Sequence, residues 1–160
     1  MTDKIQREFV KDYPRPPLLV ESTESIQVIA LGKTIIHATN SIRMLETYHP
    51  PTYYFKPDSV NQNYLTKSSR QSYCEWKGIA SYFNIKVGNK TINNVAWAYN
   101  DPCQSFKKIA GWYAVYPQLM DSCWVNNEKV DAQVGDFYGG WITSRIVGPF
   151  KGDPEHPQLI

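Results

Sequence analysis

The sequence has little of what marks a secreted or zinc-binding protein. It contains three cysteines in 160 residues, and none of them forms a C-x-x-C pair. Since an odd number of cysteines cannot all pair within one chain, we expect reduced thiols and a reducing compartment. No two ligand-type residues recur at the short spacings of structural zinc sites. We therefore expect no bound metal and no other cofactor.

Long hydrophobic runs and an excess of one charge are also missing. No apolar run approaches the ~20 residues of a membrane-spanning helix. Residues 1–11 are polar and mixed in charge, unlike a secretory signal. A formal net charge of +2 is too small to indicate a nucleic-acid-binding surface. We therefore expect a soluble, cytoplasmic protein that binds neither membranes nor nucleic acid.

The familiar catalytic signatures are absent from the sequence. It contains no G-x-x-x-x-G-K-[ST] or G-x-G-x-x-G loop for phosphates, no H-E-x-x-H and no G-x-S-x-G. These absences remove the enzyme classes that such motifs identify. They leave open whether the protein is an enzyme at all.

Aromatic residues, in contrast, are abundant. They make up 14% of the chain, with eleven tyrosines and five tryptophans, a bias that favours β-sheets and also lines pockets and interfaces. Short β-branched and aromatic runs alternate with turn residues, which predicts hairpins closed at 32–33, 88–89 and 126–127. Short strands also fit 18–21, 52–55 and 109–116. The pattern predicts a mostly β protein.

Two brief helices interrupt this pattern. Asp58 is expected to cap the first one, and the second is expected over 102–108, after Asp101. The segment 41–47 fits either a helical turn or a strand. As a strand, it would place Met44 and Glu46 on one face and Arg43 and Leu45 on the other.

The length suits one ordinary domain. We expect an extended N-terminal arm over 1–17, where prolines interrupt a polar segment. A single β domain would follow over 18–150, and a flexible tail over 151–160.

The stretch 72–82, S-Y-C-E-W-K-G-I-A-S-Y, gathers the most unusual side chains. As a continuous strand it would place Glu75 and Lys77 on one face and Cys74 on the other. A free cysteine is by default a small buried hydrophobic residue, whereas a nucleophile needs a nearby cation to lower its pKa. Lys77 is the local cation, but it lies on the opposite face of such a strand. A bulge at Gly78 would re-aim Lys77 into a cleft.

Two charged residues set among apolar neighbours, Arg43 and Glu46, complete the candidate pocket. If they faced a common cavity with Lys77 and the aromatic residues, the pocket would suit an anionic or ring-bearing ligand. Among the histidines, His37 is expected to be a half-buried strand residue. His49 fits either a surface loop or the rim of a site. The candidate ligand-binding residues are Arg43, Glu46, Tyr54, Lys77, Trp97 and Tyr99.

Four separated runs stand in a consistent order along the chain: A-T-N-S-I-R-M-L-E-T-Y-H-P-P-T-Y-Y-F-K-P-D-S-V, S-Y-C-E-W-K-G-I-A-S-Y, V-A-W-A-Y-N-D-P and I-A-G-W-Y-A-V-Y. They resemble the DUF427 family, a domain of unknown function that also carries a nucleotidyltransferase-like name. The resemblance covers 22–125, and the tail F-Y-G-G-W-I-T-S-R-I-V-G-P-F-K-G is similar to the extension of a cyanobacterial branch. The family motif positions in this sequence are Arg43, Glu46, Tyr54, Asp58, Cys74, Lys77, Gly78, Trp97 and Tyr99.

The resemblance implies a compact, tent-like antiparallel β domain, grouped with the Mss4 exchange factor and methionine sulfoxide reductase B. Those relatives hold zinc on paired cysteines, which this chain lacks, so the metal is not carried over. The sequence also lacks the G-S motif and paired aspartates with which nucleotidyltransferases hold magnesium, which argues against that chemistry here.

The leading hypothesis is a small domain that binds an anionic or ring-bearing molecule through Lys77 and Arg43, with Glu46 orienting one of them. One alternative is a transferase- or hydrolase-type enzyme that acts on such a ligand through Lys77 or Cys74. Another is a non-catalytic protein interaction module, in which the aromatic residues and the tail form the interface.

Overall fold

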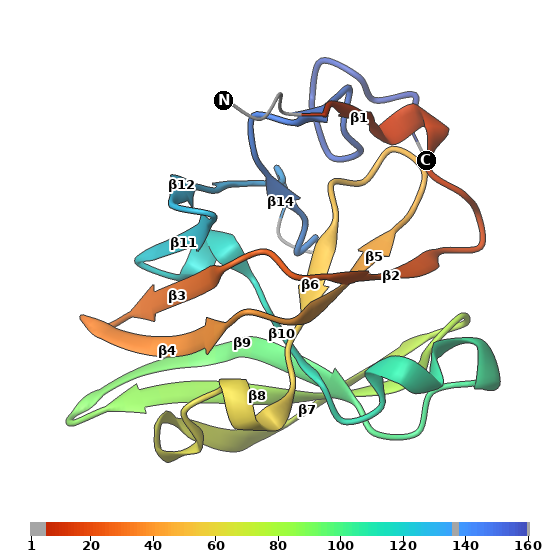
Figure 1. Cartoon of the computed structure of the whole chain (residues 1–160). Coiled ribbons are helices and arrows are strands. Elements are labelled where there is room, and N and C mark those ends of the chain that lie inside the picture. The colour runs from red at the N-terminus through yellow and green to blue at the C-terminus, as the bar shows by residue number, and fades with distance from the viewer. Residues whose placement is uncertain (1–5, 136–137, 160) are drawn as a thin grey trace.

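The computed structural model describes residues 6–135 and 138–159 of the chain (Figure 1). Strands dominate, in three main sheets and two short strand pairs. The prediction of a mostly β protein is confirmed, whereas its tent-like arrangement stays a prediction. Within the described residues, every helical segment is a 3-10 turn: η1 (Val10–Asp12), η2 (Pro57–Ser59), η3 (Gln62–Tyr64), η4 (Gln104–Ile109) and η5 (Pro117–Leu119).

The largest sheet forms the lower layer in Figure 1. Gly88 closes its central hairpin in the left-handed region, with φ of 59°, where a side chain would be strained. This is one of the expected hairpins. The strand order is β10 (Tyr113–Val115), β9 (Lys90–Tyr99), β8 (Gly78–Val87) and β7 (Leu65–Cys74).

Two further sheets lie above this layer (Figure 1). Asn126 and Asn127, both at positive φ, form the tight turn of one expected hairpin, and Gly32, also at positive φ, lies in the turn of another. Both of these hairpins are therefore confirmed. One sheet has the order β12 (Glu128–Lys129), β11 (Ser122–Val125), β3 (Ile26–Ala30) and β4 (Lys33–Ala38). The other has the order β2 (Leu18–Ser22), β5 (Ser41–Leu45) and β6 (Thr52–Tyr54).

The two ends of the chain meet through short strands. β1 (Glu8–Phe9) pairs in parallel with β15 (Ile146–Val147), and β13 (Asp131–Ala132) pairs with β14 (Trp141–Ile142). Val10 is fully buried beside Leu45 and Ile146. The segment before β2 therefore packs against β5 and against the C-terminal segment.

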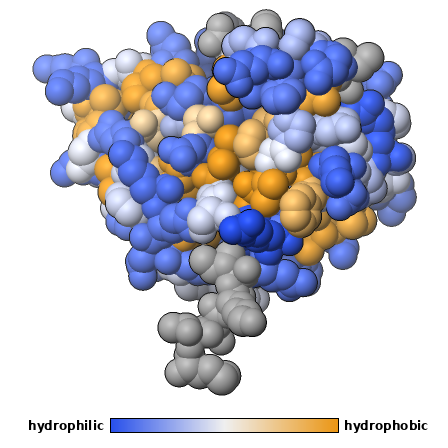
Figure 2. All heavy atoms as spheres, turned by 90° about the horizontal axis from the view of Figure 1, so that it is seen from above, coloured by the Kyte–Doolittle hydropathy of each residue, from blue (hydrophilic) through white to orange (hydrophobic). Residues whose placement is uncertain are grey.

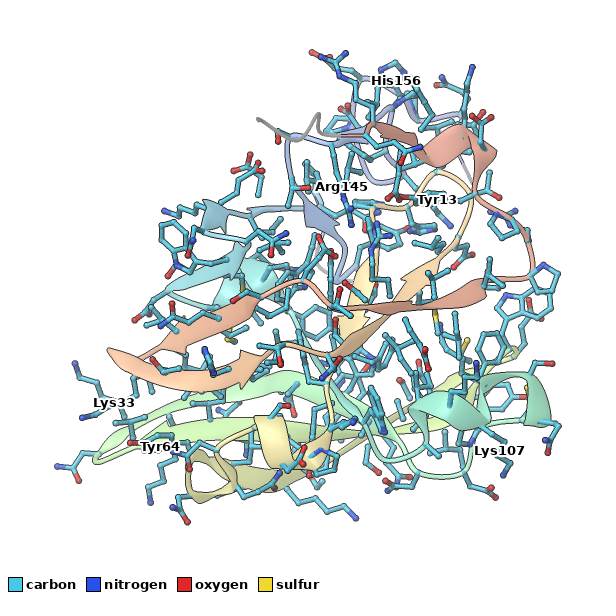
Figure 3. All side chains as sticks on the ribbon, in the orientation of Figure 1. Tyr13, Lys33, Tyr64, Lys107, Arg145 and His156 are labelled. Carbon is cyan, nitrogen blue, oxygen red and sulfur yellow. The ribbon has the colours of Figure 1, made fainter. Side chains whose placement is uncertain are left out.

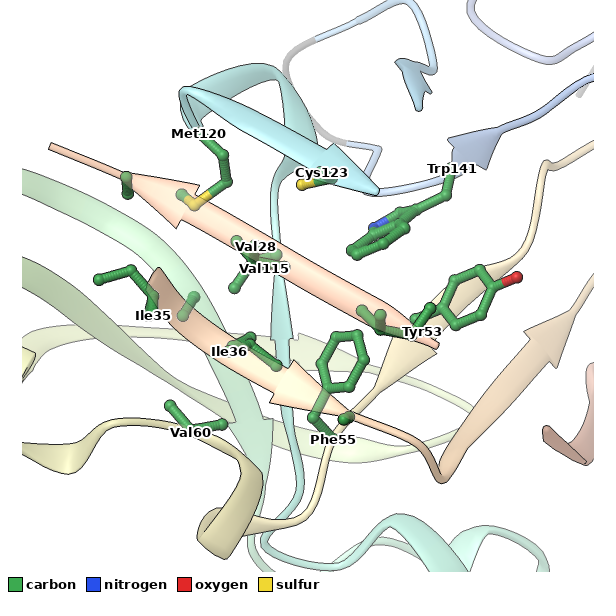
Figure 4. Close-up of a cluster of buried hydrophobic side chains, with 14 of the residues drawn as sticks. Val28, Ile35, Ile36, Tyr53, Phe55, Val60, Val115, Met120, Cys123 and Trp141 are labelled. Carbon is green, nitrogen blue, oxygen red and sulfur yellow. The ribbon is translucent and has the colours of Figure 1, made fainter. Parts of the chain in front are cut away.

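The main hydrophobic core lies between the large sheet and the β3–β4 hairpin. Val28, Ile36, Phe55 and Trp141 are fully buried there, and Figure 4 shows their side chains pointing toward one another. Trp141 packs on Tyr53 with ring centroids 4.9 Å apart. The C-terminal segment thus contributes the bulkiest residue of this core. On the face seen in Figure 2, hydrophobic residues surface between clusters of hydrophilic ones.

The ambiguity at 41–47 is resolved as a strand, β5, all of whose residues are buried. The stretch 72–82, in contrast, is not one strand. Its residues 75–77 form the turn of a hairpin in which Cys74 pairs with Gly78. The expectation that Glu75 and Lys77 share one face of a strand is therefore wrong, because alternation does not extend through a turn.

The two expected helices are replaced by 3-10 turns. Asp58 lies inside η2 instead of capping a helix, and Asn61 provides a side-chain cap to η3. The second helix starts after Cys103, two residues beyond Asp101, without a side-chain cap. His37 is exposed and not half-buried. In the described part of the chain, no helix is long and apolar enough to cross a membrane.

Candidate functional site

A cavity of about 450 Å³ opens between the large sheet and the β5–β6 strands. Its walls come from β5 to β9, from the β7–β8 turn, from the loop after β5 and from the C-terminal segment. The volume suits a small organic ligand. Five of the six candidate residues line it: Glu46, Tyr54, Lys77, Trp97 and Tyr99.

Lys77 enters the cavity from the β7–β8 turn. Gly78 has φ of 89°, and the Lys77 amide donates to the Cys74 carbonyl at 3.2 Å, which tightens the turn. The half-buried Lys77 ammonium lies 3.3 Å from the Met44 sulfur and 5.6 Å from the centroid of the Tyr99 ring. Among the described residues no carboxylate lies within 4 Å of it. The ammonium is thus held by a sulfur and an aromatic face, which leave hydrogen-bond capacity for a ligand.

Buried aromatic side chains form the inner wall. The Trp97 indole donates to the Tyr54 hydroxyl at 3.2 Å, and the two rings meet edge to face. Trp97 and Tyr99 lie two residues apart on β9, on the face toward the cavity. Burial raises the pKa of the Tyr54 and Tyr99 phenols above the ordinary value. These phenols therefore stay neutral at physiological pH and offer hydrogen-bond donors to a ligand.

The edge strand β7 adds residues that were not among the candidates. Arg70, Ser72 and Cys74 line the cavity at every second position. The Arg70 guanidinium lies 4.7 Å from the centroid of the Tyr82 ring, and the Tyr82 and Ser72 hydroxyls are 2.9 Å apart. The period-2 spacing could have identified Arg70 and Ser72, had the strand been recognised as preceding the turn.

His49, which the sequence left open, lies at the cavity and is held by Gln133. The Gln133 amide nitrogen donates to the Lys151 carbonyl at 2.8 Å and lies 3.2 Å from His49 Nδ1. Because that nitrogen is a donor, His49 Nδ1 accepts and Nε2 carries the proton. Nε2 faces the Glu46 carboxylate at 4.0 Å.

The pKa of His49 is lowered from its ordinary value. Burial is the main cause, and the Lys151 and Arg15 cations act in the same direction. The neighbouring Glu46 carboxylate and the hydrogen bond with Gln133 oppose the shift without reversing it. His49 is therefore a neutral donor at physiological pH.

Arg43 does not join the cavity. It points to the other face of β5, where it binds Glu8 at 2.8 Å and approaches Glu24 at 3.9 Å. Arg145 joins the same network through Glu24 at 3.0 Å. Figure 3 labels Arg145 and Tyr13 on this side of the molecule. The prediction that Arg43 and Lys77 share one pocket is not met, and Arg43 instead ties the N-terminal segment to β5.

The charges of this network stabilise one another. Burial alone would raise the pKa of Glu8, but hydrogen bonds from Arg43 and Tyr13 outweigh it, so that pKa lies below the ordinary value. Burial likewise favours the neutral form of Arg43, yet the hydrogen bond to Glu8 holds its pKa above the ordinary value. Both groups are therefore charged at physiological pH.

The three cysteines lie in different surroundings. Cys74 is half-buried and lines the cavity together with Lys77. Cys103 is exposed and its thiol lies 2.8 Å from the Trp76 carbonyl. Cys123 is buried in the core, which raises its pKa to about 12. The face argument against a Cys74 nucleophile no longer applies, since Cys74 ends β7 and Lys77 lies in the turn that follows.

Comparison with known protein families gives a match. The family described as Domain of unknown function (DUF427), named NTP_transf_9, matches residues 18–126. No curated protein matches the chain at a significant level. In the described residues, no three His, Cys, Asp or Glu side chains gather as metal ligands would.

Proposed function

The chain belongs to the DUF427 family, and from its cavity we propose that it binds a small organic anion that carries a ring. The carrying observation is Lys77, a half-buried ammonium whose contacts are a thioether and a tyrosine face. A half-buried ammonium attracts an anion more strongly than a fully solvated ammonium does, because screening by water is weaker there. Placement within a cyanobacterial branch stays a prediction.

The charge of the cavity supports this ligand class. Of the side chains that the structure describes, three cations line it, Arg70, Lys77 and Lys151, against one carboxylate, that of Glu46. The excess of positive charge favours an acid such as a carboxylate or a phosphate ester. Glu46, which was expected to orient a cation, instead faces His49 and offers an acceptor to a hydroxyl or amine of the ligand.

The aromatic wall supports a ring in the ligand. Trp97 and Tyr99 lie two positions apart on the same face of β9. Tyr54 and Tyr82 line the same cavity. Such faces stack on planar or sugar rings, and the neutral phenols can hydrogen-bond ring substituents. A purely inorganic anion would leave this wall without a partner.

A thermal-shift screen of aryl carboxylates, aryl phosphates and nucleotides tests the proposal. A ligand at a hundredfold excess over its Kd stabilises a protein by about 2.7 kcal/mol. For a chain of this size that is a rise in Tm of roughly 5 to 10 °C. Lys77→Gln should abolish the rise, whereas Lys33→Gln, an exposed control on β4, should keep it. No shift with any compound, or an equal shift in both variants, would refute the proposal.

Catalysis on the bound anion is the second candidate, because Cys74 and Lys77 line the same cavity. The Cys74 sulfur would attack the acyl carbon or phosphorus of an ester ligand, and the alcohol would leave with the thiol proton. Water would then hydrolyse the acyl- or phospho-cysteine, and the ammonium would stabilise the negative charge that develops in each step. Turnover of a bound ester or phosphoester that is lost in Cys74→Ser, with ligand binding retained, would support this candidate. Equal turnover in Cys74→Ser would eliminate the cysteine mechanism.

A further inference from the structure

The cavity extends beyond the part of the chain that matches the family. The match ends at residue 126, yet Gln133, Tyr138, Gly139 and Lys151 all line the cavity. The described residues of the segment 127–159 therefore build one wall of a site whose other walls belong to the family domain.

Hydrogen bonds and close packing hold this wall in place. The Trp141 amide donates to the Pro51 carbonyl at 2.8 Å, and the Lys151 amide donates to the Tyr48 carbonyl at 2.8 Å. Gly139 lies so close to the Trp97 ring that a Cβ there would overlap it. Gln133 is 2% exposed and bonds both His49 and the Lys151 backbone. The wall is thus positioned before any ligand arrives.

The wall brings its own donors to the cavity. The Lys151 ammonium lies 5.7 Å from the centroid of the Tyr138 ring, and the described residues place no carboxylate within 4 Å of it. Next to it, His49 directs its Nε2 proton toward the cavity side of Glu46, at the long distance of 4.0 Å. An acid bound here would accept from both groups. The Glu46 carboxylate beside them is 26% exposed, so water screens its repulsion of that acid.

The two cations come from different walls of the cavity. Lys77 contacts Tyr99, whereas Lys151 contacts Tyr138, the neighbour of the Gly139 that packs on Trp97. Successive residues on one face of a strand are about 7 Å apart. One small acidic group cannot engage both ends at once, but a ring with an acidic group on each side can span that distance.

We propose that the segment after the family domain gives the cavity a second anion-binding end, at Lys151 and His49. The ligand is then an organic molecule with two acidic groups separated by a ring. This inference rests on the proposed function and narrows its ligand class. It also means that Lys151 selects diacids over monoacids. Gln133 contributes to this selection by positioning His49 through a hydrogen bond.

Isothermal titration with two matched pairs of probes tests the inference. The pairs are phenyl phosphate with 4-carboxyphenyl phosphate, and benzoate with terephthalate. The wild-type protein should bind the diacid of each pair at least tenfold more tightly. Lys151→Gln should remove that preference and leave the monoacid unchanged. Lys77→Gln should weaken both members, and the exposed control Lys33→Gln should change neither.

The outcomes separate the inference from the function on which it rests. If the monoacids bind and depend on Lys77, but the diacids bind no better or Lys151→Gln affects both equally, the second anion-binding end is refuted alone. If none of the four probes binds, the proposed function and the inference both fall.

Discussion

Replacing Arg43 with methionine is the perturbation that best separates stability from ligand binding in this protein. The Arg43 side chain is 7% exposed and lies between the carboxylates of Glu8 and Glu24. Methionine keeps the bulk of the stem but removes the nearest cation of Glu8 and the more distant of the two cations beside Glu24. We therefore expect a loss of stability with no loss of affinity at the cavity.

The size of the loss follows from the surroundings. Removing one partner of a fully buried ion pair costs about 3–5 kcal/mol. Here Glu8 is 25% exposed, and Arg145 stays 3.7 Å from Glu8 and 3.0 Å from Glu24, so part of the charge remains compensated. We expect the free energy of unfolding to fall by about 2–3 kcal/mol. For a chain of this length, Tm should fall by roughly 4–12 °C.

The pH dependence gives the same prediction a second readout. The pKa of Glu8 is lower in the folded state than in the unfolded state, where it is 4.5. The contribution of Glu8 to the free energy of unfolding is therefore present above pH 4.5 and is lost as the pH falls through the folded-state pKa. The stability difference between wild type and Arg43→Met should therefore shrink below about pH 4.5.

Urea denaturation at several pH values, combined with the binding titration, is the assay. Lys107→Met is the matched control, because Lys107 pairs with the almost fully exposed Asp101 and should change stability by less than about 0.5 kcal/mol. An Arg43→Met variant as stable as the control, or one that loses ligand as Lys77→Gln does, would refute the role assigned to Arg43.

Three further predictions concern other parts of the fold. Trp141→Ala should lower the free energy of unfolding, measured by urea denaturation, by about 3–5 kcal/mol, since the ring is fully buried in the main core. A smaller loss would contradict the packing of the C-terminal segment in this core. The depressed pKa of His49 means that stability falls as the pH drops below about 6.5, by at most about 1.4 kcal/mol per pH unit, and His49→Asn should remove that dependence. Gly139→Ala should cost about 1–3 kcal/mol and weaken ligand binding, whereas unchanged affinity would contradict the contact with Trp97.

The strands and hairpins could be predicted because their signals are local. Gly88 and the Asn126–Asn127 pair mark tight turns by residue type alone, and β-branched or aromatic runs flank them. The prediction of one continuous strand over 72–82 was wrong for a related reason. Its turn, Glu75–Lys77, contains no glycine or proline, and Gly78 follows only after the turn. Nothing local distinguished a strand with a bulge from a hairpin.

The site could be predicted only where the alternation of side chains along a strand determines which face of the sheet a residue lies on. Treated as a strand, 41–47 already placed Arg43 and Glu46 on opposite faces, and the structure places them so. Their assignment to one pocket was inconsistent with that pattern. The contribution of Gln133, Tyr138 and Lys151 rests on contacts between residues some 80 positions apart, such as Gln133 with His49 at a separation of 84. Sequence periodicity carries no information about such contacts.

Ligand binding at the cavity can be tested most directly through the indole protons of the five tryptophans in an NMR titration with 4-carboxyphenyl phosphate. Trp76 and Trp97 line the cavity. Trp112 and Trp124 lie outside it, and the Trp124 indole is bonded to Ser122. We predict saturable shifts of the Trp76 and Trp97 resonances, which need a higher ligand concentration in Lys77→Gln, with Trp112 and Trp124 unchanged. Shifts confined to Trp112 or Trp124, or no shift of any indole proton, would contradict a binding site in this cavity.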